Sequence, residues 1–219
     1  MSHATHHVIE ATIAGEECLL HGYKAIFLPA SRSLLLSDLH LGKSSHFRKH
    51  GLAVPLAVME TNFLRLRELC VLFEPEEVVF LGDLFHSVEN RSIDRFHAFR
   101  QNVNVPLSLI RGNHDLYSVD LYAELGISCE THRDVGAMIW IHDESDIITD
   151  KHVVSGHVHP GVRLGDGSRN RLRLPVFCLG ESRSLLPAFG GFTGLHIISP
   201  LDDDRLYAIA EDQVVQIHR

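Results

Sequence analysis

The amino-acid sequence predicts a single α/β domain. Its length of 219 residues suits one hydrophobic core. Short apolar runs of strand type alternate with stretches of helical periodicity. The sequence contains no internal repeat, low-complexity block or linker, so we expect one domain over residues 1–219.

Each element follows from a local pattern. Alternating residues at 7–15 and 17–29 favour antiparallel strands joined by glycine turns. Apolar runs predict further strands at 33–38, 76–83, 106–113, 137–143, 152–157 and 174–180. Helical spacing predicts helices at 55–73, with Pro55 in the first position, at 92–103, with Ser92 as the N-cap, and at 118–125. The segment 164–170 is typical of a turn.

The composition is that of an ordinary globular protein, with 45% hydrophobic and 22% charged residues. No apolar run is long enough for a membrane span, and the first residues lack the pattern of a signal peptide. Four cysteines lie far apart in apolar surroundings, which favours reduced thiols and a cytoplasmic location. The net charge of −8 argues against binding nucleic acid over the whole surface, but it allows a local basic patch.

Histidine is unusually frequent, with 17 residues, and many histidines and carboxylates lie at the ends of predicted strands. Ligands bind at the carboxyl ends of strands in sheets with helical crossovers, so these side chains are expected to meet at one edge. In an extended segment residues i and i+2 point to the same side, as for His157 and His159. The candidate metal ligands are Asp38, His40, Asp83, Asn113, His142, His157 and His159.

Imidazole, carboxylate and amide oxygen without thiolate suit Mn²⁺, Fe or Zn²⁺ better than a structural zinc or a calcium site. The ligands are too many for one ion, but they suffice for two if one carboxylate bridges. One assignment has a competitor, because His132 also lies near the predicted strand 137–143. His142 directly follows the apolar run whereas His132 lies in a polar stretch, which favours His142.

The candidate residues form an ordered set of blocks: D-x-H (38–40), G-D (82–83), G-N-H-D (112–115), a histidine (142) and G-H-x-H (156–159). This set resembles the calcineurin-like metallophosphoesterases, which implies a four-layer αββα sandwich. A finer resemblance, to the bacterial ligase-associated metallophosphoesterases of the PdeM subfamily, rests on 37–55, 82–87 and 185–194. It implies a DNA endonuclease that acts in DNA repair, in functional association with a DNA ligase and a helicase.

The resemblance also implies a role for each residue. Asp38, His40 and His159 would hold one ion, and Asn113, His142 and His157 a second, with Mn²⁺ as the expected metal and Fe or Zn²⁺ as alternatives. Asp83 would bridge the two ions, and a bridging hydroxide would attack the phosphodiester in line with the leaving group. His114 would stabilise the transition state or protonate the leaving oxygen, and Asp115 would orient His114.

Basic residues flank the metal blocks in segments 43–49 and 163–173, where they would form a rim for a phosphodiester backbone. The alternating arginines of the second segment are equally typical of the solvent face of an edge strand. His86, three residues after Asp83, is either a substrate contact or a loop histidine. The candidate substrate contacts are His86, Lys43, Arg48, Arg111 and Arg163.

Three functions follow from these patterns. The first is the DNA endonuclease. The second is a small-molecule phosphoesterase that acts on cyclic nucleotides, nucleotides or phosphomonoesters with the same metals. The third is a non-catalytic scaffold, which would lack ligands, and here none of the motif ligands is missing. A protein serine/threonine phosphatase is disfavoured, because that group carries G-D-x-x-D-R where this chain has Gly82 to His86.

Overall fold

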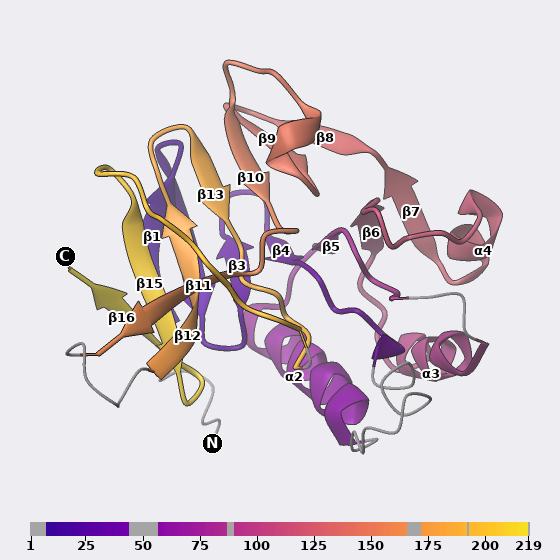
Figure 1. Ribbon diagram of the computed structural model, residues 1–219. Coiled ribbons are helices and arrows are strands. Elements are labelled where there is room, and N and C mark those ends of the chain that lie inside the picture. Colours follow the sequence, from indigo (N-terminus) through magenta and orange to yellow (C-terminus); the bar gives the residue numbers. More distant parts are fainter. Residues whose placement is uncertain (1–7, 44–56, 87–89, 166–171, 192, 219) are drawn as a thin grey trace.

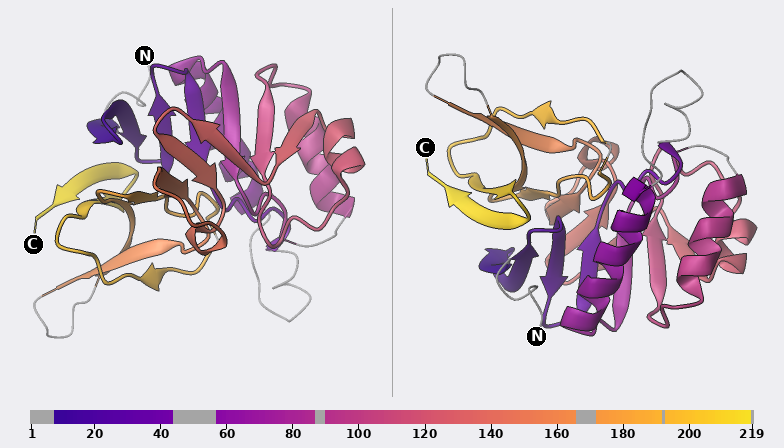
Figure 2. Two further views of the ribbon diagram at one scale, coloured as in Figure 1. Left: turned by 90° about the horizontal axis from the view of Figure 1, so that it is seen from above. Right: turned by 90° about the horizontal axis from the view of Figure 1, so that it is seen from below.

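The computed structural model describes residues 8–43, 57–86, 90–165, 172–191 and 193–218. Two β-sheets pack face to face, and α-helices cover the other face of the first sheet (Figure 1). The orange-to-yellow strands of the second sheet and the helices lie on opposite sides of the first sheet (Figure 2). The predicted α/β class is therefore confirmed. None of the described helices is long and apolar enough to cross a membrane.

The first sheet follows chain order from β1 to β7. Its strands are β1 (Val8–Ile13), β2 (Glu16–His21), β3 (Ala25–Leu28), β4 (Ser33–Leu36), β5 (Glu77–Leu81), β6 (Leu107–Ile110) and β7 (Ile127–Glu130). The first four pair antiparallel, and β4 to β7 pair parallel. The crossovers of the parallel part are α2 (Ala57–Phe73), α3 (Asn90–Arg100) and α4 (Val119–Glu124). The carboxyl ends of β4, β5 and β6 therefore share one edge.

The second sheet has the order β14-β11-β12-β13-β10-β9-β8, with β15 and β16 branching from β12. Its strands are β8 (His132–Val135), β9 (Met138–Ile141), β10 (His152–Ser155), β11 (Pro160–Leu164), β12 (Leu172–Leu179), β13 (Arg183–Leu185), β14 (His196–Ile197), β15 (Arg205–Ala210) and β16 (Gln213–Ile217). β9 and β10 run parallel, so their carboxyl ends also share an edge. A short 3-10 helix, η2 (Glu144–Asp146), lies between these two strands.

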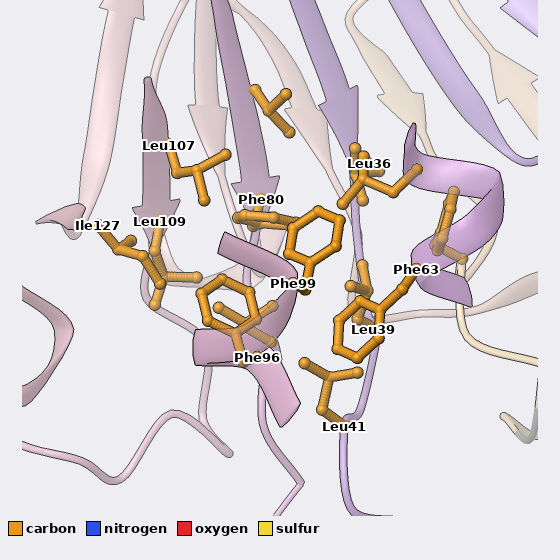
Figure 3. Close-up of a cluster of buried hydrophobic side chains, with 14 of the residues drawn as sticks. Leu36, Leu39, Leu41, Phe63, Phe80, Phe96, Phe99, Leu107, Leu109 and Ile127 are labelled. Atoms are coloured by element: carbon orange, nitrogen blue, oxygen red, sulfur yellow. The ribbon is translucent and has the colours of Figure 1, made fainter. Parts of the chain in front are cut away.

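Strand alternation divides the hydrophobic residues between two main cores. Leu36 and Phe80 face the helices, where Phe63 of α2 and Phe96 and Phe99 of α3 pack on them (Figure 3). Phe63 stacks on Phe99 with ring centroids 4.8 Å apart. Each such buried side chain contributes about 1.5–3 kcal/mol, so this layer fixes the strands that end at the shared edge.

The opposite face of the first sheet packs on the second sheet. Leu35 and Val79 meet Trp140 of β9 and Phe177 of β12 in this core. Because β4 and β5 pack on both faces, their side chains after Ser33 and Glu77 are apolar without alternation, as the sequence predicted. The two sheets are thereby held in register, which positions the ends of β9 and β10 beside those of β4 and β5.

The outer face of the second sheet carries a third, smaller apolar cluster. Val162, Val176 and Leu206 form a small cluster there, with partly buried Leu174 and Ile217 around it. The apolar residues of α2, α3 and α4 all belong to the core on the first sheet. Among the described residues, α2, α3 and α4 thus all lie against the first sheet, on the side away from the second sheet.

Most predicted elements are confirmed, with small differences at their ends. Ser92 is not the N-cap of α3, because the helix begins two residues earlier, at Asn90. Ser118 does cap α4, accepting from the N–H of Leu121 at 3.3 Å. The predicted position of Pro55 lies outside the described residues, as does most of the predicted turn at 164–170.

Candidate metal centre

The candidate ligands lie in loops at one edge of the sandwich. They follow β4 (Asp38, His40), β5 (Asp83), β6 (Asn113), β9 (His142) and β10 (His157, His159). Both sheets therefore contribute. The two contributions are joined where the backbone N–H of His157 donates to Oδ2 of Asp38 at 3.0 Å.

Five of the seven ligand candidates have a left-handed backbone. The φ angles are 54° at Asp38, 46° at His40, 53° at Asp83, 60° at His157 and 50° at His159. This conformation costs an ordinary residue about 1–2 kcal/mol, although Asp and His adopt it more readily than most. The predicted extended i, i+2 geometry is therefore wrong, because both segments turn after their strands have ended.

Glycines make room for these turns. A Cβ at Gly82, where φ is +82°, would lie 2.0 Å from Nδ1 of His142. A Cβ at Gly112 would lie 2.3 Å from Oδ1 of Asp83. Any larger residue would displace a ligand candidate, which is the physical reason for glycine in the G-D and G-N-H-D blocks.

Asp38, His40 and His159 form a first group, called the His40 group below. Nε2 of His159 lies 3.1 Å from Oδ1 of Asp38 and 3.3 Å from Nε2 of His40. Oδ1 of Asp38 is buried, and its contact with Nε2 of His159 lacks the geometry of a hydrogen bond. A buried carboxylate oxygen in that state is costly, and a cation between these three side chains would satisfy it.

Asp83, His142 and His157 form a second group, the His142 group, with Asn113 beside it. Nε2 of His142 lies 3.5 Å from Oδ1 of Asp83 and 3.1 Å from Nδ1 of His157. Its Nδ1 lies 2.9 Å from the carbonyl oxygen of Leu81. A carbonyl oxygen only accepts hydrogen bonds, so Nδ1 carries the proton and Nε2 keeps a lone pair for a ligand.

Asp83 lies between the two groups. Its Oδ2 is 3.6 Å from Nε2 of His40, and its Oδ1 is 3.5 Å from Nε2 of His142. Oδ1 also accepts the backbone N–H of His114 at 2.9 Å, which fixes the carboxylate. One oxygen thus faces each group, as a bridging ligand requires.

Electrostatics favour neutral imidazole and ionised carboxylate at the His40 group. Burial lowers the pKa of His40 to about 3, aided by the charge of Lys43 and opposed by that of Asp38. Burial alone would raise the pKa of Asp38, but His159, His142 and His40 hold it below its usual value. At neutral pH His40 is therefore neutral and Asp38 is ionised, which is the protonation state in which these two side chains bind a cation.

Two more histidines line the His40 group. Nδ1 of His86 lies 3.3 Å from Nδ1 of His40. The rings of His86 and His114 stack with centroids 5.0 Å apart, and the His114 ring lies 5.3 Å from that of His40. Both residues are half-buried, so their rings border the centre while keeping contact with solvent.

A model of the calcineurin-like phosphoesterase family matches residues 31–149, more than half of the chain. The crystal structure of Pseudomonas putida nuclease MPE is similar to this chain with a TM-score of 0.80 and 32% sequence identity, covering 95% of this chain and 100% of that chain. This chain is a calcineurin-like phosphoesterase. YfcE, a phosphoesterase from E. coli, has a TM-score of 0.44 and 16% identity, covering 84% of this chain and 97% of its own. No curated protein matched.

Calcineurin-like phosphoesterases are metal-dependent hydrolases, and the residues of this site fit divalent ions. Oδ1 of Asp38 is buried without a hydrogen bond of good geometry, and a ring nitrogen of His159 lies 3.1 Å away. Nε2 of His142, which bears a lone pair, faces Oδ1 of Asn113 at 3.2 Å. Two acceptors at this distance repel unless a cation lies beside both. Nitrogen and oxygen donors without sulfur suit Mn²⁺, Fe or Zn²⁺.

Asp115 has a different role from the predicted one. Its carboxylate accepts the backbone N–H groups of Asp83 at 2.7 Å, Leu84 at 3.0 Å and Gly112 at 2.9 Å, and the hydroxyl of Tyr122 at 3.2 Å. Both oxygens are thus occupied, so the expectation that Asp115 orients the ring of His114 is wrong. The phosphoesterase instead uses this buried carboxylate to tie the loop after β5 to the loop after β6.

The predicted substrate contacts are placed unequally. Lys43 lies within the electrostatic reach of both Asp38 and Asp83, whose charges oppose the burial that lowers its pKa. The guanidinium of Arg111 donates to the carbonyls of Asp115 and Tyr117 at 2.8 and 3.2 Å, so it braces a loop, contrary to the substrate-facing role expected of it. Arg163 is exposed on β11. Arg48 lies outside the described residues.

The geometry also separates the two competing histidines and adds one residue. His132 is exposed on β8, whereas His142 belongs to the second group. Sequence reasoning missed Asp143, whose Oδ2 lies 3.3 Å from Nε2 of His157. The only signal was its position directly after His142, and the partner histidine is fourteen positions further along the chain.

Proposed function

We propose that this phosphoesterase is a phosphodiesterase that holds two divalent ions and cleaves DNA as an endonuclease. The observation that carries the proposal is the pair of ligand groups joined by Asp83, with one carboxylate oxygen facing each. The similarity to a nuclease from Pseudomonas putida supports the choice of substrate class.

The His40 group would hold one ion, and the His142 group with Asn113 would hold the other, with Asp83 shared. Two such ions, when bound, supply charge neutralisation for the phosphate and an activated water for in-line attack. Mn²⁺ is the expected metal, because the ligand set mixes carboxylate and amide oxygens with imidazole.

His114 and His86 would act on the substrate directly. Their stacked rings border the His40 group. The backbone N–H of His114 is fixed on Asp83, so its ring has a defined place beside the bridging carboxylate. A histidine there can meet the charge that develops on the phosphate or give a proton to the leaving oxygen, which contributes about 10²–10⁴-fold.

A basic strand pair would contact the phosphate backbone of DNA. Arg163 of β11 lies directly opposite Arg173 of β12 in the antiparallel register, and both side chains are exposed. Arg173 also donates to the carbonyl oxygen of Leu195 at 2.8 Å through one nitrogen of its guanidinium. Like charges directly opposite one another destabilise a sheet, and a phosphate between them would remove that penalty. β11 begins at Pro160, directly after the ligand His159, so the pair extends from the metal centre.

We further propose a role in DNA repair, in functional association with a DNA ligase and a helicase, in the cytoplasm. These partners come from the subfamily resemblance of segments 37–55, 82–87 and 185–194. The competing function, a phosphoesterase acting on small molecules, would use the same ions without the basic strand pair.

One assay separates the two functions. Metal-free protein is supplied with Mn²⁺, and nicking of plasmid DNA is compared with hydrolysis of bis-nitrophenyl phosphate and of 2′,3′-cyclic nucleotides. The nuclease is expected to nick DNA, to lose this activity steeply with added salt, and to lose it in a double variant, Arg163→Ala with Arg173→Ala, that still cleaves the small diester. Cleavage of small diesters alone, unchanged in the double variant, would refute the endonuclease.

A further inference from the structure

Asp143 lies behind one of the ligand histidines, on the side away from the ligand group. Its Oδ2 is 3.3 Å from Nε2 of His157, while Nδ1 of the same ring faces Nε2 of His142 at 3.1 Å. The imidazole of His157 is therefore held between a carboxylate and the metal group. A carboxylate accepts hydrogen bonds but cannot donate them, so this contact favours a proton on Nε2.

Asp143 is itself held in place by its second oxygen. Oδ1 accepts the backbone N–H of Ser145 at 2.9 Å and caps η2. The next residue, Glu144, pairs with Arg183 of β13 at 2.7 Å, which pins the turn to the second sheet. One oxygen of Asp143 thus anchors the turn, and the other is left at a defined place beside His157.

His157 needs such support, because its side chain is the most exposed of the three in the His142 group. The side chain of His157 is 38% exposed, compared with 4% for His142 and 3% for Asp83. Its backbone is fixed by the N–H bond to Asp38, but the ring is not enclosed by packing. A ring in this position can turn over or carry its proton on the wrong nitrogen unless a neighbouring group prevents it.

We propose that Asp143 is a positioning residue that keeps the proton of His157 on Nε2 and thereby presents the Nδ1 lone pair to the divalent ion of the His142 group. The inference rests on the proposed metal centre. A carboxylate behind a ligating histidine fixes the ring and raises its basicity, and its loss typically weakens metal binding about 10–100-fold.

Three substitutions distinguish this positioning role from capping of η2 and from a simple effect of charge. Asp143→Asn keeps an oxygen for the cap and turns an NH₂ group toward His157, which favours the wrong tautomer. Asp143→Ser keeps the cap through its hydroxyl and removes the second oxygen without placing a donor there. Asp146→Asn removes the same charge from an exposed position in the same turn.

Mn²⁺ affinity is measured for each purified protein by competition with a chelator, and folding is checked by thermal melting. We expect one of the two binding steps to weaken about 100-fold in Asp143→Asn and about 10-fold in Asp143→Ser. Asp146→Asn should match the wild type. In the Zn²⁺-loaded wild type, long-range ¹H–¹⁵N spectra should show a histidine with a protonated Nε2 and a metal-bound Nδ1 that is absent from Asp143→Asn.

Each outcome decides the inference. Wild-type affinity in Asp143→Asn overturns it, and so does an equal loss in all three variants, which would indicate charge alone. If Asp143→Asn melts early, the capped Asp143→Ser variant carries the test. Failure of the wild type to bind two equivalents of Mn²⁺ would instead refute the proposed metal centre.

Discussion

In the His142 group each imidazole has an oxygen acceptor beside its outer ring nitrogen. The carbonyl oxygen of Leu81 lies beside Nδ1 of His142, and the carboxylate of Asp143 lies beside Nε2 of His157. In the His40 group the nitrogen of His40 that points away from the ligands faces another histidine, His86. Oxygen acceptors fix the tautomer of a ligand and add negative potential at the ion. A facing imidazole fixes the tautomer less firmly, because its own proton can lie on either nitrogen, and it adds no negative charge.

This difference indicates two ion sites of unequal strength. The charge of Lys43 acts against a cation at the His40 group, in addition to the weaker backing of His40. We therefore expect the His142 group to fill first and the His40 group to fill on addition of more metal or of substrate.

The largest effect is expected at the residue that joins the two groups. Asp83→Asn should abolish phosphodiester cleavage, by about 10³-fold or more, because two-metal stabilisation is worth several kcal/mol. Bound metal, measured by mass spectrometry after desalting, should fall from two equivalents toward none. Asp150→Asn, an exposed loop change, is the matched control. Retention of both ions in Asp83→Asn would show that the groups are independent.

His114 should separate catalysis from metal binding. His114→Ala is expected to lower kcat about 10²–10⁴-fold while both equivalents of metal are retained, because its ring borders the ligands without belonging to either group. His132→Ala removes an exposed histidine and should be silent. Loss of metal in His114→Ala would place this residue among the ligands.

His86 tests the inequality between the groups. Wild-type protein should take up Mn²⁺ in two steps, and His86→Ala should weaken only the second step, about 10-fold, because His86 contacts His40. Calorimetric titration measures both steps. His97→Ala, an exposed histidine on α3, is the control. A change confined to the first step would reverse the proposed order of filling.

The smallest effect is on stability. Ligand at about 100 times its Kd stabilises a folded chain by about 2.7 kcal/mol, which for a domain of this size corresponds to roughly 5–11 °C in Tm. Metal-free protein should therefore melt earlier than protein with excess Mn²⁺, and Asp83→Asn should show no such difference. Equal melting temperatures with and without metal in the wild type would contradict ion binding by the folded state.

The sequence was sufficient for the parts of the fold that depend on local pattern. Apolar runs at 33–36, 77–81 and 107–110 became parallel strands, and the residues directly after them reached one edge. The rule for the carboxyl ends of strands then brought Asp38, Asp83 and Asn113 together. Short strands with weak signals, such as β13 and β14, were not predicted, because three or two residues carry too little periodicity.

Contacts between distant segments could not be predicted from the sequence. Asp115 was paired with its neighbour His114, yet its carboxylate reaches across to Asp83 and Leu84 on another loop. Arg111 was assigned to substrate on the strength of its position, yet it closes its own loop. In both cases the side chain bonds to backbone groups that need a partner, and that choice depends on how the loops pack.

The left-handed backbone at five ligand positions limits which residues can replace the ligands in evolution. Glycine and asparagine hold such a backbone without strain, whereas alanine and β-branched residues do not. A lineage that no longer needed the metals would therefore be free to change residues 38, 40, 83, 157 and 159, but it would be steered toward glycine and asparagine. Glycine or asparagine at these positions would then identify a relative that has lost hydrolase activity but has kept the left-handed backbone.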